Sequence, residues 1–456
     1  MGDVVVSSIG QADDTALVSN CLLKLAGLLQ LAVEYCQKYH VELVPEKTKL
    51  LAFSPTGQKS TLHLKKLLTP LSLNGHEISF STFAEHVGVL RSVEGNMPSL
   101  MARISAHTRA VMAVLPAGMA RGHSGNPAAS LRLERLYGCP VFLSGLASLV
   151  LNKSETSVLH HHHKLNQQKM MKLHQGTPEG VVMFLAGSLP ATALLHLRML
   201  GLLGMIARLG PSNILHQHGR HILLSVSTGR SWFLTIRDVC LQYGLLDPLL
   251  ILQTPPSKHS WKNLTKSKVI DWWEIKLRGE IEFMDSLEFF HASYMNLTAP
   301  HPLWSSARSP YEVRKAVVAV RMLSGRYRTD RLARHWSKSN PSGFCQLPAC
   351  TGEQDGTLEH LLLYCPALSE ARSRVIKLWS NYMVSHQYLF PVVADLTLES
   401  DKMHMQLLLD PSCIPSVIAA NKLNSAVLPA CFYLSRTWCY TIHLTRTRLQ
   451  KLWNLI

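Results

Sequence analysis

The chain has 456 residues, of which 47% are hydrophobic, and its 46 Lys and Arg against 30 Asp and Glu give a formal net charge of +16. This length suggests about three domains with substantial cores, and the apolar content excludes wholesale disorder. The excess of positive charge points to a polyanionic partner, most often nucleic acid, because neutralising phosphates releases counterions. The alternatives are a soluble protein that is basic without such a partner and a protein that associates with anionic membranes.

The cysteine content and the N-terminal residues indicate the compartment. Ten Cys in this length is ordinary, and the first residues lack the regions of a secretory signal. We therefore expect an intracellular protein of the cytoplasm or nucleus, not a secreted one, in which clustered cysteines favour a metal over disulfides. The most apolar stretch, 184–209, is interrupted by Pro190, His196 and Arg198, so we expect no membrane span.

Two adjacent carboxylates, Asp13 and Asp14, follow a strand-like run near the start of the sequence. The apolar segments 4–9 and 15–19 flank a short turn, which predicts a β-hairpin with both acids at its tip. Carboxylates on such a rigid mount suit a divalent cation. The alternative is a solvated turn, because Gly and Asp are favoured in turns without any metal.

The residues up to about 95 predict one helix and several short strands. Apolar side chains in the helical segment recur at helical spacing. Asn74-Gly75 between two apolar runs is the strongest short signal for a hairpin. The expected elements are a helix at 21–40, a strand at 50–53, a hairpin over 71–80 and a strand at 85–90.

From about residue 98 the pattern becomes one of helices separated by Pro and Gly. The predicted helices cover 98–115, 127–151, 155–174, 189–208 and 230–243, and then a Pro- and Lys-rich connection at 254–268 precedes a helix at 269–287. The tract His160–His163 is interpreted as a polar loop or helix face more readily than as a metal site. The tail to Ile456 is expected to be helical.

A basic helix is predicted from Tyr311 to about Trp336. Such a helix suits phosphate groups, with Tyr327 or Trp336 stacking on a base, and a solvated charged face is the alternative. Its basic residues are Arg314, Lys315, Arg321, Arg326, Arg328, Arg331 and Arg334.

A Cys/His cluster follows this helix. Its members are Cys345, Cys350, His360 and Cys365. Three thiols and one imidazole, in two close pairs separated by a short loop, match the ligand set of a tetrahedral zinc ion. No open coordination position is evident, so a structural site is expected rather than a catalytic one. Coincidental cysteines beside a core histidine are the alternative.

In four motifs, with a helical region between the third and the fourth, the sequence resembles in the same order the reverse transcriptases of non-LTR (LINE-like) retrotransposons. The segment 9–19 resembles their catalytic Ala-Asp-Asp hairpin, and 45–53 resembles the next palm motif, whose lysine lies near the incoming triphosphate. The segment 85–90 is similar to the primer-gripping hairpin, and the basic helices at 98–150 fall where the family has its thumb. The Cys/His cluster falls where many of these proteins carry a C-terminal zinc knuckle.

This resemblance implies RNA-directed DNA synthesis with two Mg²⁺ or Mn²⁺ ions about 3.5–4 Å apart. It implies that Asp13 and Asp14 hold the ions, Asp14 more as a supporting charge, and that Lys47 or Lys49 stabilises the leaving pyrophosphate. It also implies Zn²⁺ at the Cys/His cluster. The implied fold is α+β at the N-terminus, as a partial polymerase palm, followed by a mostly α-helical thumb and connection with a small zinc-knuckle module.

The resemblance divides the chain into five expected parts. These are a partial reverse transcriptase palm at 1–95, a helical thumb and connection at 96–253, a basic helical linker region at 254–340, a CCHC zinc knuckle at 341–370 and a helical C-terminal tail at 371–456.

Departures from the family pattern bear on activity. Gln11 stands where an aromatic residue is usual, and only residues 1–12 precede Asp13, whereas the palm needs an earlier metal-binding Asp together with the fingers. The endonuclease of many relatives is also missing. We therefore expect a 5′-truncated fragment that binds RNA or DNA with little or no polymerase activity of its own.

Two other functions stay open from the sequence. One is a domesticated nucleic-acid-binding protein without enzymology, and the other is a zinc-stabilised helical interaction scaffold whose charge is incidental. The expected partners are an RNA template and a DNA primer or target, with a complete element-encoded polymerase in trans as a further one, and no membrane.

Overall fold

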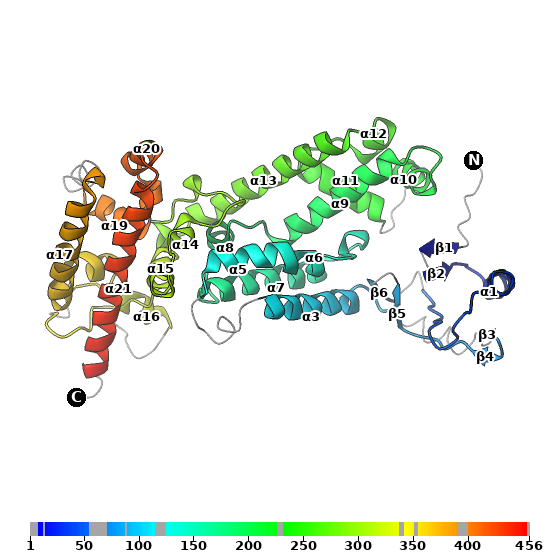
Figure 1. The fold of residues 1–456 in the computed structure, drawn as a ribbon, viewed down its shortest axis with the longest axis horizontal. Helices are drawn as coiled ribbons and strands as arrows, with labels where there is room; N and C mark the ends of the chain where they lie inside the picture. Colours follow the sequence, from blue (N-terminus) through cyan, green and yellow to red (C-terminus); the bar gives the residue numbers. More distant parts are fainter. Residues whose placement is uncertain are drawn as a thin grey trace. The chain divides into compact units, whose positions relative to one another are not determined.

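The structure is a computed structural model that describes residues 8–11, 14–53, 71–86, 89–114, 125–225, 231–336, 342–350, 354–389 and 400–453. Within these ranges the chain is mostly helical, and its paired strands form two-stranded antiparallel sheets in the N-terminal part (Figure 1). The expected largely helical fold is confirmed. The interpretation of the N-terminal part as a polymerase palm stays a prediction.

The chain forms two compact units, each assembled from three separate segments. Unit 1 comprises 1–110, 138–160 and 191–269, and unit 2 comprises 111–137, 161–190 and 270–456. Three of the five boundaries fall inside α3 (Met97–Val114), α7 (Lys153–Met171) and α13 (Lys258–Glu282). The five parts expected from the family resemblance stay a prediction.

The N-terminal hairpins follow the turn signals. β1 (Ser8–Gln11) pairs with β2 (Asp14–Leu17), with Gln11 opposite Asp14, so the first hairpin is confirmed. β3 (Ser72–Leu73) and β4 (His76–Glu77) flank Asn74 at φ 50° and Gly75 at φ 78°, the positive angles that a tight hairpin turn requires.

Two expected strands differ from the structure. The strand predicted at 85–90 is a third hairpin, β5 (Phe83–His86) with β6 (Val89–Ser92). The strand predicted at 50–53 is reduced to one parallel bridge between Leu50 and Phe80. Leu50 nevertheless belongs to a small core with Leu73 and Ile78, against which α1 (Leu22–Lys38) packs.

In unit 1 the long helix α9 (Ala191–Arg208) contacts three shorter helices. These are α10 (Ile214–Leu224), α11 (Trp232–Gln242) and α12 (Pro248–Gln253). α9 also packs against the first turns of α13, where Trp261 Nε1 donates to the Leu200 carbonyl at 2.7 Å and a Cβ on Gly204 would lie 2.3 Å from the Trp261 ring. By length and composition alone α9 would pass for a membrane-spanning helix, a test that a buried core helix also passes.

Two predicted helices have different bounds. The helix at 127–151 is broken into α5 (Pro127–Leu133), a π-helical turn (Glu134–Gly138) and α6 (Cys139–Phe142). Pro140, which has no N–H to donate, and Gly145, at φ 72°, interrupt the helical pattern there. α13 begins at Lys258, inside the predicted connection.

The predicted basic helix from Tyr311 to Trp336 is two helices, α15 (Pro310–Leu323) and α16 (Asp330–Trp336). Gly325 ends α15 in the left-handed region at φ 64°, and a Cβ there would lie 2.3 Å from the Ser286 carbonyl oxygen. Tyr327, which the sequence offered for base stacking, is only 9% exposed and hydrogen-bonds to His443 Nδ1 at 3.0 Å. The prediction that Tyr327 stacks on a base is therefore wrong. The side chain of Trp336, the other residue predicted to stack, lies outside the described residues.

Unit 2 is built around α21 (Val427–Trp453), the red helix of Figure 1. The helices that contact it include α15, α17 (Ser369–Ser385), α19 (Asp401–Leu409) and α20 (Pro415–Leu423). Two further helices of the unit are α8 (Glu179–Ala186) and α14 (Pro302–Ser305).

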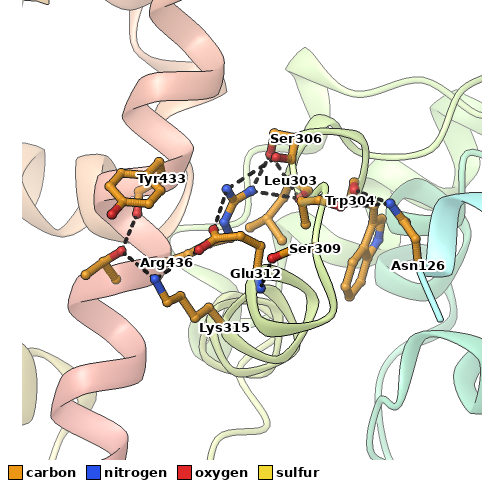
Figure 2. Close-up of polar contacts among 11 residues, drawn as sticks. Asn126, Leu303, Trp304, Ser306, Ser309, Glu312, Lys315, Tyr433 and Arg436 are labelled. Atoms are coloured by element: carbon orange, nitrogen blue, oxygen red, sulfur yellow. Dashed lines mark hydrogen bonds and ion pairs between the residues drawn. The ribbon is translucent and has the colours of Figure 1, made fainter. Parts of the chain in front are cut away.

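A charged network is buried between α21 and α15 (Figure 2). Arg436 is 2% exposed, and its Nη2 donates to Glu312 Oε2 at 3.0 Å and to the Ser306 carbonyl at 3.3 Å. Lys315 Nζ lies 3.0 Å from Glu312 Oε1 and donates to Thr437 Oγ1 at 3.2 Å. Burial lowers the pKa of Arg436 and the Glu312 carboxylate opposes that shift. One carboxylate thus neutralises two inward-facing cations, so Lys315 is not part of an exposed basic face.

We expect Glu312→Gln to destabilise the protein by about 2–4 kcal/mol, because it leaves two buried cations without a counter-charge. Denaturant unfolding followed by circular dichroism measures the change. The matched control is Glu370→Gln, whose side chain is 86% exposed and whose loss is expected to cost less than about 0.5 kcal/mol. Equal effects of the two substitutions would contradict the role of Glu312.

Candidate metal centre

The second pair of cluster residues is positioned by an unusual helical turn. Thr357 caps the start of this turn, because its hydroxyl accepts a hydrogen bond from the His360 N–H at 3.1 Å. Residues His360–Tyr364 then form a π-helical turn, which closes with the Cys365 N–H donating to the His360 carbonyl at 2.7 Å. A π-turn has hydrogen bonds between residues five apart, so His360 and Cys365 lie one turn apart on the same side of it.

The first pair is positioned by backbone hydrogen bonds of a short bridged loop. The Cys345 N–H donates to the Gln354 carbonyl at 2.9 Å, beside the antiparallel bridge between Phe344 and Asp355. Cys350 ends a tight turn in which its N–H donates to the Leu347 carbonyl at 3.1 Å. The preceding residue of that turn, Ala349, has φ 65°. Both thiols are therefore carried by constrained backbone.

The four candidate ligand atoms lie within 4.8 Å of one another. Cys345 Sγ is 3.8 Å from Cys365 Sγ, and Cys350 Sγ is 3.5 Å from His360 Nε2. Bond lengths of about 2.3 Å to sulfur and about 2.05 Å to nitrogen at tetrahedral angles place two sulfurs about 3.8 Å apart and a sulfur and a nitrogen about 3.6 Å apart. The predicted cluster is thus brought together, and its geometry can hold a metal ion and is compatible with zinc.

The protonation states of the cluster also suit a metal. Burial lowers the pKa of His360, and Arg372 lowers it further, which favours the neutral imidazole that binds metals. The hydrogen bond between Cys345 and Cys365 raises the pKa of the first and lowers that of the second, so Cys365 is the thiol of this pair that loses its proton more readily. The thiolate is the form that ligates.

Arg372 on α17 supplies a positive charge at the cluster. Its Nη2 donates to the Cys365 carbonyl at 2.7 Å, whereas its buried Nη1 has no hydrogen-bond partner. Three thiolates around Zn²⁺ carry a net charge of −1, which a neighbouring guanidinium balances. The orphaned N–H therefore fits a loaded centre better than a pair of neutral thiols.

The residues around the cluster are joined to α21 in two ways, through Asp330 and directly by Trp438. Arg446 Nη2 lies 3.2 Å from Asp330 Oδ1, and the other oxygen of Asp330 accepts the Gln346 N–H at 3.4 Å. Trp438 Nε1 donates to the Leu362 carbonyl at 3.3 Å. Residues 342–368 carry the four candidate ligands. We call this segment the metal module. Its support by α21 gives it a fixed place in unit 2.

Of the predicted palm residues, the structure describes the side chains of Lys47 and Lys49. Asp13 and the side chain of Asp14 lie outside the described residues, so the carboxylate geometry stays a prediction. Lys47 and Lys49 are exposed around a turn after α1.

The histidine tract forms part of α7, as its interpretation as a helix face predicted. His163 is fully buried, with Gln167 Nε2 3.2 Å from its Nε2.

Arg372 and Asp330 were not found by sequence reasoning. Arg372 reaches Cys365 only because α17 turns back over the metal module, and Asp330 acts through Arg446, far along the chain. No local spacing signals either contact. The spacing of the Cys and His residues in the sequence was sufficient to predict the four ligands.

We expect purified protein to contain about one zinc ion per chain, because the centre offers four ligands at zinc distances. Cys350→Ser is expected to abolish the bound zinc and lower thermal stability, since metal binding and folding are coupled. Elemental analysis and a melting curve measure both. Cys36→Ser, a half-buried thiol outside the cluster, is the control and should retain the metal. Zinc-free protein with unchanged stability would rule the centre out.

Comparison of the chain with protein-family models, with curated proteins and with solved structures gives no match. The resemblance to reverse transcriptases therefore rests on the four sequence motifs, and the metal centre rests on its own geometry.

Proposed function

We propose that the chain is a segment of a non-LTR retrotransposon reverse transcriptase that binds RNA or DNA through the metal module and basic helices. The observation that carries this proposal is a Cys/His centre at zinc distances, mounted on a basic helical unit. It stands in the same order after the acidic hairpin as the zinc knuckle of that family.

The character of α21 supports a polyanionic partner. The segment 427–453 contains Arg and Lys but no Asp or Glu. Arg436 and Arg446 are buried and paired, so its exposed cations are Arg448 and Lys451 near the end of the helix. The metal module is fixed to this same helix through Asp330 and Trp438. A rigid zinc module beside a basic helix is an arrangement that tracks phosphates.

Zinc in a site with four protein ligands has a structural role. Here Cys345 and Cys365 are buried, so the metal would hold the loop between them rather than meet a substrate. The metal module would then present its exposed residues as a fixed surface. Its contribution to binding is expected to depend on the metal.

We expect the protein to bind single-stranded RNA with an affinity that falls steeply as salt rises, because phosphate contacts release counterions. Fluorescence anisotropy of a labelled oligouridine, measured between low and moderate salt, gives the slope of log K against log salt. Removal of zinc by a chelator should weaken binding. A flat salt dependence would overturn nucleic-acid binding and favour the scaffold function instead.

We expect a polypeptide of this sequence to extend no primer on an RNA template with Mg²⁺ or Mn²⁺. The two-metal mechanism needs a further metal-binding Asp besides Asp13 and Asp14 and a surface that grips template and nucleotide, and the palm-like motifs at 9–19, 45–53 and 85–90 include neither. Product above that of an Asp13→Asn control would contradict this expectation and restore an enzymatic function.

A further inference from the structure

A basic surface forms on unit 2 where α15, the end of α7 and α21 come together. Arg321 Nε on α15 donates to the carbonyl of Lys172, just after α7, at 3.0 Å. The Tyr311 ring on α15 lies edge-on to the Tyr440 ring of α21, with centroids 5.8 Å apart. We call Lys172, Arg314, Arg321 and Tyr311 the α15 basic surface.

The side chains of this surface share one face of α15. Residues three and seven positions apart lie on the same side of a helix, which places Tyr311, Arg314 and Arg321 in one row. Arg314 and Arg321 are exposed, and Tyr311 is 54% exposed. An aromatic ring and two guanidinium groups therefore face solvent together.

The surface has almost no negative charge of its own. The segments 161–177, 310–329 and 427–453 that surround it contain a single acidic residue, Glu312. That carboxylate is turned inward to Arg436 and Lys315. In the described parts of the chain no ion pair involves Arg314 or Arg321.

The cations on this surface act on one another. Burial lowers the pKa of Lys172, and the charges of Arg321 and Arg314 lower it further. Arg321 likewise lowers the pKa of His443 on α21, after burial and Arg446. Positive charges are thus gathered at short range, which costs free energy that an anionic ligand would recover.

We propose that the α15 basic surface binds single-stranded nucleic acid, with phosphates at Arg314, Arg321 and Lys172 and a base stacked on Tyr311. A ring beside clustered guanidinium groups is the combination that holds an unpaired base and its flanking phosphates. This inference rests on the proposed function and names the surface that performs it.

The test compares the salt dependence of oligouridine binding by the full chain and by the double variant Arg314→Gln with Arg321→Gln. Each phosphate contact to a single strand contributes about 0.7 to the slope, so the double variant should lower its magnitude by about 1.4. Tyr311→Leu should weaken binding about tenfold while leaving the slope unchanged, since stacking releases no counterions. Circular dichroism checks that each variant is folded.

The matched control is Lys402→Gln, an exposed cation already paired with Glu288 at 2.9 Å, which should alter neither quantity. If the wild-type chain binds oligouridine but the double variant keeps the same salt slope, the α15 basic surface is not the binding site and the proposed function stands. If the wild-type chain does not bind RNA, the proposed function itself fails. Binding of phosphatidylserine vesicles without RNA binding would overturn the surface as a nucleic-acid site and assign it to a membrane.

Discussion

Two guanidinium groups of α21 are buried, and each is neutralised by a carboxylate from another helix. Arg436 pairs with Glu312 on α15, and Arg446 pairs with Asp330 at the start of α16. Burying an unpaired charge costs several kcal/mol, whereas a paired and hydrogen-bonded charge is tolerated. Because α21 has no acidic residue of its own, it can be buried only with these two helices in place. The rest of unit 2 depends on that constraint.

The metal module depends on the second of these pairs. Asp330 accepts from Arg446 on one oxygen and from the Gln346 N–H on the other, so the same carboxylate that compensates a buried charge also holds the backbone between Cys345 and Cys350. Arg372 on α17 also holds the backbone of the module, because it donates a hydrogen bond to the Cys365 carbonyl. The ligands are therefore arranged partly by their own loops and partly by electrostatics that originates outside the module.

Local signals in the sequence were sufficient where the structure is locally determined. Asn74-Gly75 predicted its hairpin because the positive φ angles of such a turn favour those residues, and the Cys/His spacing predicted the cluster because zinc tolerates few ligand sets. The helices at 98–115, 155–174 and 189–208 were found within a few residues. Apolar periodicity is enough for such elements.

The remaining features depend on tertiary partners that periodicity does not contain. Lys315 reads as one more cation of a basic helix, yet it is buried because Glu312 and two tyrosine rings surround it. Tyr327 reads as a base platform, yet α21 covers it. The break at Gly325 follows from the approach of the Ser286 carbonyl. In each case the decisive neighbour is distant in sequence.

The interleaving of the two units has a consequence for biosynthesis. The chain passes from one unit to the other five times, at 110, 137, 160, 190 and 269. The segments 111–137 and 161–190 therefore leave the ribosome long before α21, the helix around which their unit is organised. Contacts of such long sequence separation form slowly and expose apolar surface meanwhile. Until α21 has been synthesised, the earlier segments of unit 2 lack their main packing partner, and no single cut in the sequence separates the two units.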